Sequence, residues 1–120
     1  NFLGKIKPDE LKELYSKSRY HLQLSIFEGF GYALGEAMLC ECIPIVSSVN
    51  MLPEIAGEAG FVLEKRDVRL LENTIRKVLS VQNSDDLGKI ARQHIVNNYS
   101  LERRKNNLLS IAEKYINNDI

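Results

Sequence analysis

The fold is decided by one stretch, Ser25-Ile-Phe-Glu28-Gly-Phe-Gly31-Tyr-Ala-Leu-Gly-Glu36-Ala-Met38. Its two carboxylates stand eight positions apart, and three glycines lie between them. A strand-like segment, Tyr20–Leu24, comes before the stretch, and its second half is a helix-like run that ends near Cys40. The sequence therefore predicts a strand, a glycine-bearing turn and a helix, with Glu28 in the turn and Glu36 inside the helix.

The start of this predicted helix offers a site for an anionic ligand. If the helix begins near Gly31 or Tyr32, its first free N–H groups and the positive end of its dipole face the turn. Gly29 and Gly31 allow a close approach of the backbone or a positive φ. Glu36 leans back toward the helix N-terminus, so it and Glu28 can face one ligand. A nucleotide sugar, with a diphosphate between two hydroxyl-bearing ends, fits this arrangement.

The glycine spacing excludes two other phosphate-binding motifs. Gly29-x-Gly31-x-x-x-Gly35 is one residue longer than the dinucleotide fingerprint G-x-G-x-x-G, and the chain has no G-x-x-x-x-G-K-[ST] motif. The residue types alone leave one alternative open. The stretch could be an ordinary strand–turn–helix unit whose glycines only shape the turn and whose acids are solvated.

The composition indicates one globular domain without a nucleic-acid partner. The chain has 120 residues, of which 44% are hydrophobic and 27% charged, and 16 basic residues balance 16 acidic ones. No apolar run reaches transmembrane length and no signal peptide is visible, so we expect a cytoplasmic location. Cys40 and Cys42 are too few for a zinc site and poorly spaced for a disulfide, so we expect buried thiols.

Strand-like and helix-like segments alternate along the chain. We expect strands at 1–4, 20–24, 43–47 and 61–63. We expect helices that begin at Pro8 and near Gly31, a short one over Pro53–Ala56, and three more capped by Asp67, Ser84 and Ser100. This alternation predicts an α/β fold with a doubly wound parallel sheet, whose ligands bind beyond the carboxyl ends of the strands. The turn 25–31 and the loop 47–54 both lie there and are expected to face one cleft.

Four motifs in this order resemble one enzyme family. They are Ser25-x-x-Glu28-Gly-Phe-Gly31, Glu36-Ala-Met38, Pro44-Ile-Val46 and Leu52-Pro-Glu54-Ile55. Together they resemble the retaining glycosyltransferases of family 4, the group 1 glycosyltransferases, over essentially the whole chain. The resemblance implies a Rossmann-like domain of a GT-B enzyme. Residues 1–120 would be part of its C-terminal domain, which binds the nucleotide sugar, and the N-terminal acceptor domain would be absent from this chain.

The resemblance also implies a reaction and residue roles. A sugar would pass from a UDP- or GDP-sugar to a glycan or lipid-linked acceptor, with retention of configuration and without a metal or other cofactor. Glu28 would contact hydroxyls of the transferred sugar as the candidate catalytic carboxylate, and Glu36 would bind the ribose. The sugar and diphosphate would meet the backbone of the intervening turn, at Gly29, Phe30, Gly31, Tyr32 and Ala33.

Several features depart from the family pattern. Glu41 stands where the family usually has glycine, so the central helix is expected to end differently, and Asn50 replaces another common glycine. We expect neither to touch the site, and we expect structural roles for His21 and His94. The family's diphosphate-binding Arg and Lys are expected upstream of Asn1, so the fragment alone is expected to be inactive, and only the missing part could contact the inner face of a membrane. Two alternatives remain: a non-catalytic nucleotide-binding module, or a flavodoxin-like interaction domain whose turn binds nothing.

Overall fold

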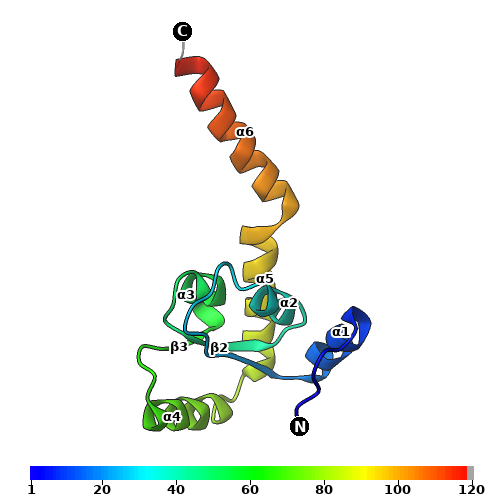
Figure 1. Cartoon of the computed structure of the whole chain (residues 1–120), viewed down its shortest axis with the longest axis vertical. Coiled ribbons are helices and arrows are strands. Elements are labelled where there is room, and N and C mark those ends of the chain that lie inside the picture. The colour runs from blue at the N-terminus through cyan, green and yellow to red at the C-terminus, as the bar shows by residue number, and fades with distance from the viewer. Residues whose placement is uncertain (119–120) are drawn as a thin grey trace.

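The computed structural model describes residues 1–118, and their side chains as far as residue 116. Three parallel strands pair in chain order: β1 (Tyr20–Gln23), β2 (Ile43–Ser47) and β3 (Phe61–Leu63). The helices are α1 (Pro8–Lys17), α2 (Tyr32–Leu39), α3 (Leu52–Ala56), the 3-10 turn η1 (Gly57–Ala59), α4 (Val68–Leu79), α5 (Ser84–Tyr99) and α6 (Leu101–Asn118). Helices α2, α3 and α5 cover one face of the sheet and α4 covers the other, which confirms the predicted doubly wound α/β class (Figure 1).

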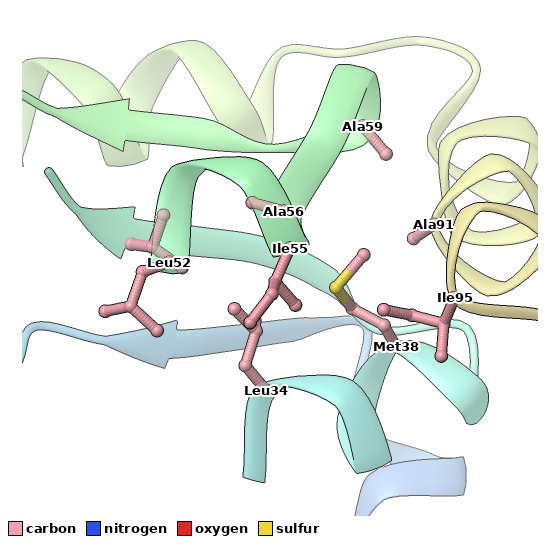
Figure 2. Close-up of a cluster of buried hydrophobic side chains, with 9 residues drawn as sticks. Leu34, Met38, Leu52, Ile55, Ala56, Ala59, Ala91 and Ile95 are labelled. Atoms are coloured by element: carbon pink, nitrogen blue, oxygen red, sulfur yellow. The ribbon is translucent and has the colours of Figure 1, made fainter. Parts of the chain in front are cut away.

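The middle strand, β2, divides the core into two clusters. All five of its residues are buried, and successive side chains point to opposite faces. On one face Val46 packs under α2, α3, η1 and α5, in the cluster drawn in Figure 2. On the other face Ile45 packs with Leu63 and with Val78 of α4. The strand is therefore apolar throughout, as a parallel strand covered on both sides must be.

The N-terminal residues are not the strand that we expected. Residues 1–4 have no strand structure, and the side chains of Phe2 and Leu3 are exposed. A strand needs a neighbour that pairs with its backbone groups. In the part of the chain that the structure describes, β1 pairs only with β2, and no strand takes up residues 1–4.

Two of the three predicted N-caps, Asp67 and Ser100, are confirmed by their hydrogen bonds. The Asp67 side chain accepts a hydrogen bond from Leu70 N (2.9 Å), and Ser100 Oγ accepts one from Arg103 N (3.2 Å). Ser84 was predicted as a cap but is instead the first residue of α5, after Asn83. Its hydroxyl accepts a hydrogen bond from Arg19 Nη1 (2.7 Å), so it joins α5 to the chain before β1 rather than capping its own helix.

The C-terminal end of α2 corrects a second expectation. Glu41 takes the left-handed conformation, with φ of 67°, although it is not a glycine. Cys42 N bonds to Ala37 O (3.1 Å) and Glu41 N bonds to Met38 O (2.9 Å), which is the hydrogen-bond pattern of a Schellman cap. The helix thus ends as the glycine-containing pattern would end it. The strain of a non-glycine residue there is about 1–2 kcal/mol.

The two cysteines differ in their surroundings. Cys42 is buried, and its thiol donates to the carbonyl oxygens of Tyr15 and Ser18, each at 3.2 Å. Cys40 is only half-buried, and both thiols are free. The expectation of buried thiols is confirmed for Cys42 and is too strong for Cys40, because Cys40 is the C-cap of α2 and faces the groove beside α1.

The last helix, α6, projects from the body of the domain (Figure 1). The predicted apolar positions are helical but not buried. Leu101, Leu108 and Tyr115 are all exposed, because no other described element packs along most of the helix. No helix among the described residues is long and apolar enough to cross a membrane.

Candidate functional site

The geometry of the candidate site begins at Gly31, the N-cap residue of α2. Gly31 is buried and has φ of 85°, in the left-handed region. A Cβ atom at this position would lie 2.8 Å from Leu52 Cδ2 of α3. Glycine is therefore favoured by its backbone angle, and a larger residue would also force the Leu52 side chain to shift. The predicted helix start and the positive φ at Gly31 are both confirmed.

The first turn of α2 faces solvent with its N–H groups unoccupied by side chains. Among the described residues no side chain caps this helix, and its first turn holds no acidic residue. Tyr32 and Ala33 are exposed, and Tyr32 retains 74% of its accessible surface. Free N–H groups at a helix N-terminus carry partial positive charge and accept anions. The turn is therefore suited to a phosphate or diphosphate.

Glu28 lies in the loop between β1 and α2, and its carboxylate is held by three donors. Oε2 accepts hydrogen bonds from Gln23 Nε2 (2.7 Å) and Ser25 Oγ (3.4 Å), and Oε1 accepts one from Gly29 N (3.1 Å). The residue is half-buried. A carboxylate can accept about four hydrogen bonds, so at least one acceptor position is left for a ligand hydroxyl. The three donors fix the direction in which that position points.

Behind Gln23 stands His21, on the same face of β1. His21 Nε2 lies 3.2 Å from Gln23 Oε1, and because that oxygen only accepts, the ring nitrogen is the donor. Burial lowers the pKa of His21, and the bond to Gln23 opposes this shift. The ring also meets Tyr15 edge to face at 5.7 Å. The contacts fit the expected structural role for His21, which supports Gln23 and through it Glu28.

The loop after β2 supports the same turn. Ser47 Oγ donates to Ser25 O at 2.8 Å, and the Asn50 side-chain amide donates to the backbone carbonyl of Glu28. Asn50 has φ of 47°, the left-handed conformation that asparagine tolerates. The expectation that Asn50 does not touch the site is therefore wrong. The two loops expected to lie together at the carboxyl ends of β1 and β2 are in direct contact.

Glu36 lies in the second turn of α2, exposed in a groove between α1 and α2. The groove has a volume of about 410 Å³, and its lining includes Lys12, Tyr15 and Arg92. Burial raises the pKa of Tyr15, and the negative charge of Glu36 adds to the shift. Glu28 and Glu36 thus have different surroundings, with the first turn of α2 between them in the chain. The structure therefore does not bring the two carboxylates into one groove.

Comparison with known proteins places this arrangement in a family. Residues 1–94 match the family described as glycosyl transferases group 1. The chain belongs to the group 1 glycosyltransferases.

Individual relatives of this glycosyltransferase chain agree with that assignment. It is 39% identical over 67 residues to O-antigen chain mannosyltransferase B of Escherichia coli, covering 56% of the chain and 18% of that protein. It is 30% identical over 105 residues to N-acetyl-alpha-D-glucosaminyl L-malate synthase of Bacillus anthracis, covering 85% of the chain and 27% of that protein. The matched segments thus span less than a third of these relatives.

A solved structure confirms the fold of the glycosyltransferase chain. It superposes on sucrose-phosphate synthase from Thermosynechococcus elongatus with a TM-score of 0.78 and 25% identity, over 97% of this chain and 30% of that one. This likeness supports the GT-B, Rossmann-like assignment made from the motifs.

Sequence reasoning missed three residues that support the candidate site: Gln23, Asn50 and Tyr99. A signal for Gln23 was present, because His21, Gln23 and Ser25 alternate and so point to one face of a strand. No local pattern pointed to Asn50 or Tyr99, whose contacts with Glu28 and Phe30 join segments 22 and 69 positions apart (50 − 28 and 99 − 30). Within the described residues no group of three or more His, Cys, Asp or Glu side chains could hold a metal ion.

Proposed function

We propose that this chain is the donor-binding part of a retaining glycosyltransferase of family 4. It lies in the C-terminal domain and works with an N-terminal acceptor domain elsewhere in the protein. The enzyme transfers a sugar from a UDP- or GDP-sugar to a glycan or lipid-linked acceptor. One observation carries the proposal: the N-terminus of α2 is exposed and has no side-chain cap, and Glu28, just before it in the chain, is already oriented by three donors.

The ligand contacts follow from this arrangement. The diphosphate accepts hydrogen bonds from backbone N–H groups at the start of α2, from Phe30 to Ala33, where Gly29 and Gly31 leave room for it. Glu28 accepts hydrogen bonds from hydroxyls of the transferred sugar. Glu36, in its groove beside α1, accepts them from the ribose hydroxyls. The sugar and the ribose of the donor then each bind a carboxylate, and the diphosphate between them binds the N-terminus of α2.

Sugar transfer mainly requires stabilisation of the negative charge on the leaving diphosphate. As the bond from the sugar to the diphosphate breaks, charge develops on the leaving group next to the positive end of α2. The acceptor hydroxyl attacks from the face that the diphosphate leaves and passes its proton to an oxygen of the leaving diphosphate, so this scheme needs no second carboxylate as a general base. Glu28 serves as the catalytic residue by contacting the sugar and stabilising positive charge at its reacting carbon. No metal is required by this scheme.

The cationic part of the site comes from outside this chain. Lys5 and Lys7 are exposed and precede α1. We therefore assign them to the solvated surface and not to the α2 turn. Arg and Lys side chains elsewhere in the full-length protein contact the outer oxygens of the diphosphate. On this account the isolated fragment binds nucleotide weakly and turns over no donor.

The test is turnover by the full-length protein with a panel of nucleotide sugars. The panel begins with the UDP and GDP forms of mannose, because the E. coli relative is named a mannosyltransferase. We expect one donor to be consumed, Glu28→Gln to reduce the rate strongly, and product NMR to show the anomeric configuration of the donor. A protein that binds nucleotide but consumes no donor would instead be a non-catalytic module.

A further inference from the structure

Tyr99, the last residue of α5, packs against Phe30 in the turn that leads into α2. The centroids of the two rings lie 5.5 Å apart and their planes meet at 76°, an edge-to-face arrangement. Phe30 also meets Tyr32, the first residue of α2, at 5.2 Å. A side chain from the far end of the domain sequence therefore contacts the glycine-bearing turn directly.

Tyr99 is itself anchored to α3. Its hydroxyl donates to Glu54 Oε1 at 3.5 Å. Burial raises the pKa of Tyr99, and the charge of Glu54 adds to this shift. The ring also stands 6.0 Å from His94, whose Nε2 lies 3.0 Å from Glu54 O. Contacts with α3 and with its own helix thus set where the Tyr99 ring lies.

The space beside this cluster is open. A groove of about 890 Å³ is lined by Phe30, Tyr32 and Tyr99, and by side chains of α6 such as Arg103 and Leu108. Without the Tyr99 ring, Phe30 would have room to turn into this groove. Phe30 directly precedes Gly31, the cap of α2, so its side chain is attached next to the peptide groups of the helix start.

We propose that Tyr99 is a positioning residue for the donor site. Through Phe30 it holds the turn from Phe30 to Tyr32 in the geometry that binds the diphosphate, and it touches no ligand itself. This inference rests on the proposed function of that turn. Because Glu36 lies in a different groove, the effect of Tyr99 is confined to the diphosphate end of the donor and leaves the nucleoside end unchanged.

The experiment compares two ligands in the full-length protein. Calorimetry gives Kd for the best-bound nucleoside diphosphate among UDP, GDP and ADP, and displacement NMR gives Kd for the matching nucleoside. We expect Tyr99→Leu to weaken diphosphate binding by roughly three- to tenfold, the scale of an aromatic pair, with nucleoside binding unchanged. Tyr99→Phe keeps the ring but loses the hydroxyl bond to Glu54, so it should weaken diphosphate binding less than Tyr99→Leu does. Tyr115→Leu, an exposed tyrosine on α6, is the matched control.

Two outcomes would overturn the inference while the proposed function stands. One is unchanged diphosphate binding in Tyr99→Leu, and the other is an equal loss for both ligands, which a general structural role would produce. If the wild type binds neither ligand, the proposed function itself fails. A second variant guards against misfolding of Tyr99→Leu: Phe30→Leu should give the same selective loss, and the double variant should add nothing further. Additive losses would contradict the proposed coupling.

Discussion

Gln23 Nε2 donates a hydrogen bond of 2.7 Å to Glu28 Oε2, and this bond joins the end of β1 to the candidate catalytic carboxylate. A hydrogen bond to a charged group contributes about 1.5–3 kcal/mol. We expect Gln23→Leu to lower kcat/KM for the donor by roughly ten- to a hundredfold, because Glu28 loses its shortest side-chain donor. Steady-state kinetics with the full-length enzyme measure the effect.

A matched variant separates this effect from the general loss of a glutamine. Gln93→Leu also removes a side-chain bond, from Gln93 Nε2 to Asn97 Oδ1 at 2.7 Å, but this bond lies on the exposed face of α5. Gln93→Leu should keep the wild-type kcat/KM. Equal rates for Gln23→Leu and wild type would show that Gln23 does not orient Glu28.

Glu41 holds a strained conformation that glycine would adopt freely. Its φ of 67° costs about 1–2 kcal/mol for a side chain, and the greater freedom of glycine in the unfolded chain offsets part of the gain. We expect Glu41→Gly to raise the free energy of unfolding by about 0.5–1 kcal/mol in chemical denaturation. Glu41→Ala, which keeps a Cβ atom, should not show this gain.

Gly88 and Gly35 provide a contrasting pair of helix glycines. A Cβ atom at Gly88 would lie 2.5 Å from the carbonyl oxygen of Glu41, whereas one at Gly35 would meet nothing within 4 Å. We expect Gly88→Ala to destabilise the fold by at least about 1–3 kcal/mol through overpacking, and Gly35→Ala to stabilise it by up to about 1 kcal/mol. Thermal unfolding of both variants measures the difference, and a shift of the same sign in both would contradict it.

The two thiols should differ in reactivity. Burial, with the nearby Cys40 adding to it, raises the pKa of Cys42 to about 11, and Cys42 is buried whereas Cys40 is half-exposed. Because the thiolate is the reactive form, iodoacetamide at pH 8 should modify Cys40 first, as peptide mass spectrometry would show. Rapid modification of Cys42 in the folded protein would disagree with its buried position.

The raised pKa of Cys42 also sets a direction for stability with pH. The folded protein holds the thiol proton of Cys42 more tightly than the unfolded chain does. Unfolding at high pH therefore releases this proton, and the free energy of unfolding falls as the pH rises. The contribution of the neutral Cys42 thiol to the free energy of unfolding is fully present below the ordinary thiol pKa. It is lost as the pH rises through about 11. Denaturation from pH 8 to 11 should show a smaller loss of stability in Cys42→Ala than in the wild type.

Much of the fold follows from local sequence patterns. The strand, turn and helix around Glu28 were predicted because the apolar run, the glycines and the helix start are all local signals. The strand expected at residues 1–4 was wrong, since an apolar Phe-Leu pair becomes a strand only beside a partner. Ser84 fits the pattern of a helix cap, but its hydroxyl accepts a hydrogen bond from Arg19, 65 positions earlier in the chain.

The site was predictable in its residue types and less so in its support. The positions of Gly31, Glu28 and Glu36 relative to α2 follow from their spacing on a strand–turn–helix unit. Part of the support for Glu28 comes from outside the motif. The Asn50 side chain, in the loop after β2, donates a hydrogen bond to the backbone carbonyl of Glu28. Such contacts depend on tertiary packing, which the spacing of residues along one element does not contain.

In the proposed function, the start of α2 and the carboxylates of Glu28 and Glu36 bind a nucleotide sugar. The most direct test is calorimetric titration of UDP, GDP, ADP and CMP into the full-length protein, with Glu36→Ala and the control Glu72→Ala on α4. We predict that one nucleotide binds, that Glu36→Ala weakens it by roughly ten- to a hundredfold, and that Glu72→Ala does not. Equal binding in Glu36→Ala and wild type would remove Glu36 from the site, and no binding of any nucleotide would contradict the account.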